Sequence, residues 1–270
     1  MTRIDDCFAK LRSVNRKALI PFITAGDPSL EATVPVMHAL VDAGADVLEL
    51  GVPFSDPMAD GPTIQRSSER ALARGAGLAY VFDCVRAFRE RDRDTPVVLM
   101  GYLNPVEIRG AERFAREAVG AGVDGVLLVD LPPEEAAEFR TAFTAQGLAL
   151  ILLASPTSSA ARLAQLCRDA QGYLYYVSFA GVTGADRLDT AAAGERLRRA
   201  LRRDSAVPVV AGFGIKDATS AAAMAADADG VVVGSALVAV LAEGGPDAAA
   251  ARARAFLAPL RAALDAAAAA

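Results

Sequence analysis

The stretch AGVDGVLLVDLPP (residues 121–133) contains, in order, the end of a helix, a short apolar strand and a loop. A glycine ends the helix, an Asp-Gly pair turns the chain, and a run of Val and Leu suits a strand that is covered on both faces. The same phrase recurs as ADGVVVGSA (228–236) and in part as AGADVLELG (43–51). Three helix-then-strand phrases indicate repeated βα units and a parallel sheet.

Outward from these phrases, the whole chain alternates between short apolar runs and helical segments. The runs are LIPFIT (19–24), DVLEL (46–50), PVVLM (96–100), DGVLLV (124–129), LALILL (148–153), YLYYV (173–177), VPVVA (207–211) and DGVVV (229–233). Eight parallel strands close a (β/α)8 barrel, and 270 residues are near the roughly 250 typical of that fold.

The connections are short, and no Pro/Ser-rich linker interrupts the chain. We therefore predict an α/β protein in which residues 1–270 form a single (β/α)8 TIM-barrel domain, with an additional N-terminal helix and long active-site loops. The main alternative, a doubly wound open sheet, fits less well because no Gly-rich dinucleotide fingerprint follows the first strand.

Composition and charge exclude several function classes. The 28 Lys and Arg against 33 Asp and Glu leave a net charge of −5, which gives no reason to expect nucleic acid or an anionic membrane as a partner. Cys7, Cys84 and Cys167 show no CxxC spacing, so a disulfide framework or a thiolate metal site is not expected. His38 is the only histidine, which argues against His-based metal sites and Ser-His triads. Without an apolar signal core or a membrane-length apolar run, we expect a cytoplasmic protein.

In a barrel of this kind the active site lies on the loops that follow the strands. Alternation along the second strand separates Leu48 and Leu50, which suit the helical layer, from Glu49, which then points into the barrel. A carboxyl group among apolar neighbours has a raised pKa and can act as a general acid or base near neutrality. The alternative is a glutamate that is occupied by a buried hydrogen bond or ion pair.

The loop VPFSDPMADGPTIQ (52–65) follows this strand and carries Asp56 and Asp60. Its three prolines fix φ and stiffen it, which a catalytic group requires. One carboxyl on the strand and another on a stiff loop nearby form a plausible acid/base pair. Either aspartate could instead be an ordinary turn or helix-capping residue.

Glycine turns follow the last three strands, where such barrels commonly bind phosphate. They are GVTG (181–184), GFGI (212–215) and Gly234-Ser235. Glycine lets the backbone approach phosphate oxygens, and a helix that begins near Ser235 would offer free N–H groups. The first of these turns could also form a mobile lid. These residues predict an enzyme that cleaves or rearranges a small phosphorylated metabolite.

Taken together, the motifs resemble the tryptophan synthase α-subunit family along essentially the whole chain. They are LELGVPFSDPMADGPTIQ (48–65), IPFITAGDP (20–28), YLNP (102–105), VDLPPEE (129–135), GVTG (181–184), GFGI (212–215) and DGVVVGSA (229–236). The resemblance implies retro-aldol cleavage of indole-3-glycerol phosphate to indole and glyceraldehyde 3-phosphate, a carbon–carbon lyase reaction of L-tryptophan biosynthesis.

The resemblance also implies residue roles and a partner. Glu49 would move the protons, Asp60 would stabilise charge at the indole N–H, and Tyr175 would lie beside them. It assigns Phe22, Met100, Thr183 and Phe213 to the indole, Gly184, Gly214, Gly234 and Ser235 to the phosphate, and Asp56 and Asp130 to communication between subunits. Indole would pass to a β subunit that carries pyridoxal phosphate, in an αββα heterotetramer, while this chain would bind no cofactor or metal of its own.

Two segments depart from the family pattern. Phe179-Ala180 precede GVTG where a small polar residue is expected, and Lys216-Asp217-Ala218 replace Ser-x-Pro after GFGI. Three other functions stay open: a stand-alone lyase that releases free indole, a phosphosugar isomerase or other phosphate-binding barrel lyase, and a barrel that only binds a partner. The presence of both Glu49 and Asp60 argues against the last.

Overall fold

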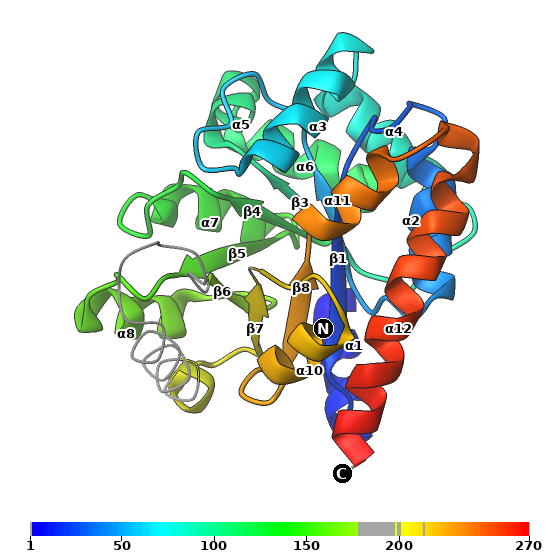
Figure 1. The fold of residues 1–270 in the computed structure, drawn as a ribbon. Coiled ribbons are helices and arrows are strands. Elements are labelled where there is room, and N and C mark those ends of the chain that lie inside the picture. Colours follow the sequence, from blue (N-terminus) through cyan, green and yellow to red (C-terminus); the bar gives the residue numbers. More distant parts are fainter. Residues whose placement is uncertain (1, 178–197, 199–200, 213, 270) are drawn as a thin grey trace.

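The computed structural model describes residues 2–177, 198, 201–212 and 214–269. Eight parallel strands close into a barrel in the order β1-β2-β3-β4-β5-β6-β7-β8 (Figure 1). The strands are β1 (Ala18–Thr24), β2 (Leu48–Gly51), β3 (Val97–Gly101), β4 (Gly125–Leu128), β5 (Ala149–Ala154), β6 (Leu174–Val177), β7 (Val209–Gly212) and β8 (Gly230–Val233). The predicted (β/α)8 barrel is therefore confirmed, with every expected run at the site of a strand.

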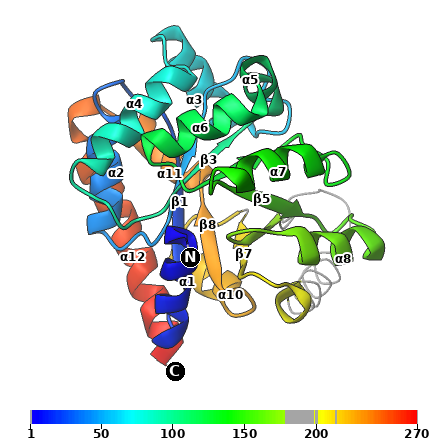
Figure 2. The ribbon, with the colours of Figure 1, turned by 180° about the vertical axis from the view of Figure 1, so that it is seen from behind.

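The described helices lie around the outside of the barrel in the two ribbon views (Figures 1 and 2). They are α1 (Arg3–Ser13), α2 (Thr33–Asp42), α3 (Pro62–Ala73), α4 (Leu78–Arg89), α5 (Leu103–Arg109), α6 (Ala111–Ala121), α7 (Ala136–Ala145), α8 (Ala160–Asp169), α10 (Ala218–Ala225), α11 (Ser235–Ala242), the 3-10 turn η1 (Pro246–Ala248) and α12 (Ala249–Ala269). None of the described helices is long and apolar enough to cross a membrane.

Alternation along the strands divides the apolar side chains into two sets. Leu48 and Leu50 belong to the larger cluster, between strands and helices, while Val47 belongs to the smaller cluster inside the barrel. The predicted facing of the second strand is therefore confirmed. Glu49, which lies between the two leucines, is fully buried and is directed toward the interior.

The additional N-terminal helix covers the end of the barrel at which the strands begin. A capping box at Thr2 starts α1, and Ile4, Phe8 and Leu11 from one face of the helix join the cluster inside the barrel. Spacings of four and three residues place these side chains together, so one face of the helix is buried.

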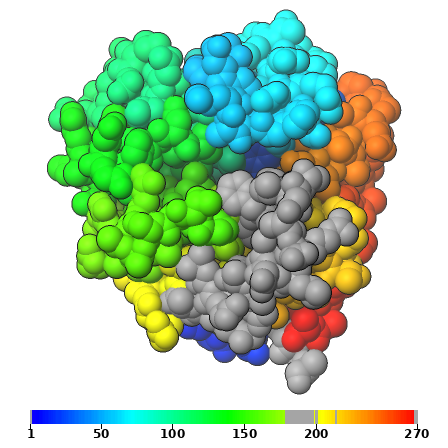
Figure 3. All heavy atoms as spheres, turned by 60° about the vertical axis from the view of Figure 1, so that its left-hand side comes forward, coloured from blue at the N-terminus to red at the C-terminus, as the bar shows by residue number. Residues whose placement is uncertain are grey.

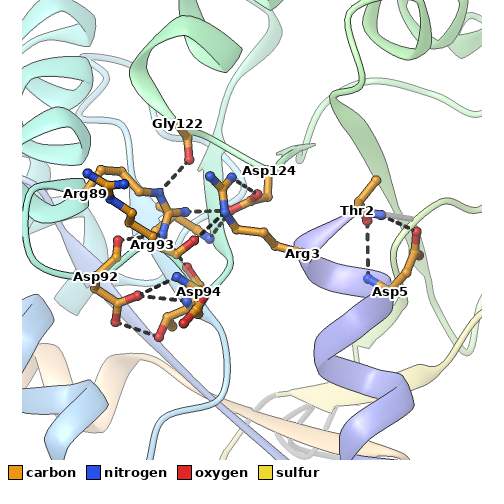
Figure 4. Close-up of polar contacts among 11 residues, drawn as sticks. Thr2, Arg3, Asp5, Arg89, Asp92, Arg93, Asp94, Gly122 and Asp124 are labelled. Carbon is orange, nitrogen blue, oxygen red and sulfur yellow. Dashed lines mark hydrogen bonds and ion pairs between the residues drawn. The ribbon is translucent and has the colours of Figure 1, made fainter.

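Arg3 holds this helix to the barrel wall (Figure 4). Its guanidinium pairs with the buried carboxylate of Asp124 at 2.7 Å and donates to the carbonyl of Arg93. Asp124 also pairs with Arg89 at 2.7 Å and accepts the backbone N–H of Val97, the first residue of β3. Because two guanidinium groups and a strand amide satisfy this carboxylate, the start of α1 is fixed to β3 and β4.

Candidate active site

Glu49 lies inside the barrel on β2, between Phe22 of β1 and Val98 of β3 in the strand register. The phenol of Tyr173 donates a hydrogen bond of 2.6 Å to Oε1 of Glu49, and both side chains are fully buried. Among the described residues no hydrogen-bond partner meets Oε2, and no Arg or Lys forms an ion pair with this carboxyl group. The glutamate is thus held at one oxygen by a neutral group and has the other oxygen available.

Burial raises the pKa of Glu49 to about 7, against an ordinary value of 4.5, and the hydrogen bond from Tyr173 opposes the rise. Burial dominates because removing the charged form from water costs more than one neutral donor restores. Both protonation states are then populated near neutrality, which suits a group that gives a proton and takes one back.

This pKa makes stability depend on pH. Between pH 4.5 and about pH 7 the folded chain keeps a proton on Glu49 that the unfolded chain has lost. The free energy of unfolding therefore falls as the pH rises through this window, by on the order of 2–3 kcal/mol from this group. Glu49→Gln removes this pH dependence. In urea unfolding, the free energy of unfolding of the variant minus that of the wild type should therefore be larger at pH 8 than at pH 5. The same difference in free energy of unfolding at pH 5 and at pH 8 would contradict a raised pKa of Glu49.

Asp60 lies on the loop that connects β2 with α3, and hydrogen bonds from neighbouring side chains hold this loop in place. The phenol of Tyr102, at the end of β3, donates to Oδ2 of Asp60 at 3.0 Å and accepts the backbone N–H of Ala59 at 3.0 Å. The Gln65 side chain donates to the carbonyl of Asp60 at 2.9 Å, and Phe54 stacks on Tyr102. Burial raises the pKa of Asp60, opposed by the hydrogen bond from Tyr102.

Tyr175 lies on β6 and is partly buried at the top of the barrel interior. A Cβ added to Gly212 would lie 2.2 Å from its phenol oxygen, so the ring reaches the end of β7. Burial and the nearby Glu49 raise the pKa of Tyr175 well above its usual range, and its phenol stays protonated. The ring therefore lies between Glu49 and the turn after β7.

Phe22 and Met100 meet in one apolar cluster with Ile64 of α3 and Val238 of α11. A Cβ added to Gly51 would lie 2.6 Å from Cζ of Phe22, while one added to Gly234 would lie 3.6 Å from its Cβ. The Phe22 ring thus spans the distance from the second strand to the turn after the eighth. Figure 3 shows the segment after β2, in light blue, and the segment of α11, in orange, on two sides of a hollow in this face.

The interior of the barrel ends in a ring of partly buried side chains at the mouth. Four of these side chains pack on the interior cluster: Met100 of β3, Val129 directly after β4, Leu153 of β5 and Tyr175 of β6. Met100 and Tyr175 were predicted as site residues from the sequence, whereas Val129 and Leu153 were not. Both of the latter also line a hollow of about 270 Å³ between the ends of β4 and β5.

The described part of the predicted phosphate site lies at the ends of β7 and β8. Gly234 precedes α11, and Ser235 is the exposed first residue of that helix. The first N–H groups of a helix have no partner within it, so they face outward at this point. Gly214 has a φ of +72°, a left-handed conformation that favours glycine. Thr183, Gly184 and Phe213, together with the Phe179-Ala180 departure, lie outside the described residues.

The second departure from the family pattern preserves the helix start. Asp217 caps α10: its side chain accepts the backbone N–H of Ser220 at 2.8 Å, and the Ser220 hydroxyl accepts the backbone N–H of Asp217 at 3.1 Å. This capping box starts α10 at Ala218 in place of the expected Ser-x-Pro, so the segment Lys216-Asp217-Ala218 still leads into a helix after β7.

Asp56 and Asp130 are both exposed on the face at which the strands end. The Ser55 hydroxyl donates to Oδ2 of Asp56 at 2.5 Å, within the loop that carries Asp60. Oδ1 of Asp130 accepts the backbone N–H of Leu103 at 2.8 Å, which joins the end of β4 to the start of α5. Neither side chain contacts Glu49.

Two tyrosines that hold the carboxyl groups were not predicted from the sequence. Tyr173 precedes Tyr175 by two residues, so strand alternation places both phenols inside the barrel, and this pattern could have identified it. Tyr102 belongs to the YLNP motif, but its contact with Asp60 depends on how two loops meet, and no local pattern predicts that.

Comparison with known proteins identifies the family. A family model described as "Tryptophan synthase alpha chain" matches residues 8–266. The chain is 77% identical over 267 residues to the tryptophan synthase alpha chain of Xanthomonas axonopodis pv. citri (strain 306), covering 98% of this chain and 99% of that protein. The chain belongs to the tryptophan synthase alpha chain family.

Solved structures of this family share the barrel. The crystal structure of tryptophan synthase subunit alpha from Legionella pneumophila str. Paris superposes with a TM-score of 0.89 at 48% identity, covering 98% of this chain and 99% of that chain. An aminoacrylate-bound form of tryptophan synthase from M. tuberculosis gives 0.87 at 36% identity, covering 98% and 100%. The resemblance to the tryptophan synthase alpha chain family that the motifs indicated is therefore confirmed.

Proposed function

We propose that this chain catalyses the retro-aldol cleavage of indole-3-glycerol phosphate to indole and glyceraldehyde 3-phosphate, the α reaction of tryptophan biosynthesis. One observation carries the proposal: Glu49 is fully buried, has a pKa of about 7, and has one oxygen without a hydrogen-bond partner among the described residues, inside a barrel of the tryptophan synthase alpha chain family.

The reaction needs two proton transfers that a single carboxyl group can perform. The protonated Glu49 gives its proton to indole C3, which turns the ring into a leaving group. The resulting carboxylate takes the proton of the C3′ hydroxyl as the C3–C3′ bond breaks. The bonding electrons return to the indole ring, the hydroxyl carbon becomes the aldehyde, and Glu49 regains its proton. A pKa near the working pH favours both transfers, and positioned acid/base groups supply about 10²–10⁴-fold each.

Asp60 and the apolar cluster complete this assignment. Protonation at C3 places positive charge on the indole nitrogen, and a carboxylate on the stiff loop after β2 would stabilise that charge. Phe22 and Met100 offer an apolar surface for the ring, with Tyr175 beside Glu49. The N–H groups at Gly214, Gly234 and Ser235 would hold the phosphate, with Thr183, Gly184 and Phe213 completing the site as the family pattern implies.

The partner is a tryptophan synthase β subunit in an αββα assembly, which would carry the pyridoxal phosphate. The relatives' name, alpha chain, denotes one component of a larger enzyme, which favours this proposal over a stand-alone lyase. Two exposed apolar side chains support a docking face at the barrel mouth, Met58 after β2 and Ile108 in α5, with 86% and 81% of their surface exposed. Asp56 and Asp130 lie on the same face and would transmit partner binding to the loops after β2 and β4.

We expect Ile108→Asp to weaken binding of the β subunit by about tenfold, since placing a charge in an apolar contact costs on the order of 1.4 kcal/mol or more. Titration calorimetry with the β subunit measures this. Val14→Asp is the matched control, because Val14 is also exposed (68%) but follows α1 at the opposite end of the barrel. Equal weakening by both substitutions, or by neither, would argue against this docking face.

Indole release from indole-3-glycerol phosphate by the purified chain, with and without the β subunit, tests the proposed function. Stimulation by the β subunit supports the α reaction within a complex. A full rate without any partner would favour the stand-alone lyase, and no release under either condition would refute the proposal.

A further inference from the structure

The floor beneath Glu49 is built by α1, a helix outside the eight βα units. Tyr173 holds Glu49 through the 2.6 Å hydrogen bond, and Phe8 of α1 packs on the Tyr173 ring, with ring centroids 5.9 Å apart and planes tilted by 48°. Phe8, Tyr173 and Glu49 therefore form a buried column from the floor of the barrel toward its mouth. Only the topmost member belongs to the proposed chemistry.

The same helix also contacts the backbone on both sides of this column. Ile4 lies one turn before Phe8 and packs on Gly172, the residue before Tyr173. A Cβ built on Gly172 would lie 3.2 Å from Cδ1 of Ile4. The Cys7 thiol donates to the carbonyl of Asp46 at 3.3 Å, three residues before Glu49. The Arg3–Asp124 ion pair fixes the start of the helix (Figure 4).

We propose that Phe8 is a positioning residue of the cleavage site: it fixes the Tyr173 ring, and through that ring it sets the orientation of the Glu49 carboxyl group. The position of a buried ring within its rotamer is fixed by the side chains that pack against it, and Phe8 is one of these for Tyr173. A ring that shifts or tilts from this position weakens the 2.6 Å hydrogen bond, because such bonds depend on both distance and angle. This inference rests on the proposed function, since it assigns a support to the group that moves the protons.

The charges around the column lie away from Glu49. Among the described residues, Tyr173 is the titratable group that shifts the pKa of Glu49, through its hydrogen bond, while Glu49 in turn raises the pKa of Tyr173 and of Tyr175. Phe8 also borders a hollow of about 60 Å³ in the floor, lined further by Leu11, Arg12, Asn15, Arg16, Lys17, Arg202, Pro208 and Asp229. Phe8 thus lies between this hollow, which charged side chains line, and the Tyr173 ring. Shortening the Phe8 side chain therefore removes a contact of that ring.

The test follows the Glu49 carboxyl itself by ¹³C NMR in full-length chain labelled with [5-¹³C]glutamate, with the signal assigned by its loss in Glu49→Gln. Tyr173→Phe removes the hydrogen bond, so the titration midpoint of Glu49 should rise by roughly one pH unit. Phe8→Leu keeps an apolar side chain at the floor but leaves the phenol ring less constrained, so the midpoint should rise in the same direction by a smaller amount. In the Tyr173→Phe background, Phe8→Leu should change nothing further.

Leu11→Ala is the matched control, because Leu11 is buried on the same face of α1 and borders the same hollow. It should lower the unfolding midpoint in urea and leave the Glu49 titration at the wild-type value. If Phe8→Leu lowers stability without moving the titration, or moves it downward, the inference is overturned; Phe8→Met repeats the comparison if Phe8→Leu does not fold. Because the readout is independent of turnover, a wild-type chain that releases no indole would refute the proposed function and leave this test intact.

Discussion

Glu49→Gln is expected to reduce indole release from indole-3-glycerol phosphate by at least about 10²–10⁴-fold, the contribution of a positioned acid/base group. The amide has nearly the shape of the carboxyl group, and its oxygen can still accept the hydrogen bond from Tyr173. It has no acidic proton for indole C3, however, and cannot take one from the C3′ hydroxyl. Single-turnover cleavage measures the loss, and direct binding of the substrate should largely survive.

Two comparisons separate this loss from a folding defect. Urea unfolding should show that the variant is at least as stable as the wild type at pH 8, because the amide removes a group that burial keeps from ionising freely. The wild-type rate of cleavage should change with pH around pH 7, the pKa of Glu49, and the residual rate of the variant should not. Near-wild-type turnover by the variant would remove Glu49 from the mechanism.

Asp60→Asn is expected to cause the second large loss, again about 10²-fold or more in the rate of cleavage. The amide can still accept a hydrogen bond from the indole N–H but carries no charge to balance the positive charge that develops there. The contact with Tyr102 can persist, so the loop after β2 should keep its place. Single-turnover cleavage at saturating substrate measures the effect on the chemical step.

Asp56→Asn is the control for this substitution. Asp56 is on the same loop, exposed, and bonded to Ser55, so its change should leave cleavage by the isolated chain intact and affect only the response to the β subunit. Equal losses from Asp56→Asn and Asp60→Asn would mean that the loop as a whole, and not the charge of Asp60, determines the rate.

The sequence was sufficient to predict the barrel because short apolar runs alternate with helical segments along the whole chain, and three of these runs share one local phrase. Both the number of strands and their order therefore follow from local patterns. The same alternation predicted that Glu49 points inward. Element boundaries moved by up to two residues, as for β2, which begins at Leu48 and not at Asp46, because hydrogen bonds to neighbouring strands decide where a strand begins.

The groups that set the properties of the carboxyl groups were harder to predict. The contact of Tyr173 with Glu49 joins residues 124 positions apart in the chain, and it exists only after the barrel closes. Tyr102 reaches Asp60 from a different loop, and Phe8 reaches Tyr173 from a helix outside the repeat. Local periodicity indicates which side chains face inward, but not which of them meet across the interior.

A crystal structure of Glu49→Gln with intact indole-3-glycerol phosphate tests the central claim most directly. We predict that the C3–C3′ bond of the substrate lies against the side chain at position 49, with the indole on Phe22 and Met100, its N–H facing Asp60, and the phosphate at the backbone of Gly234 and Ser235. A substrate bound at this mouth with its C3–C3′ bond out of reach of position 49, or an indole N–H turned away from Asp60, would contradict the account.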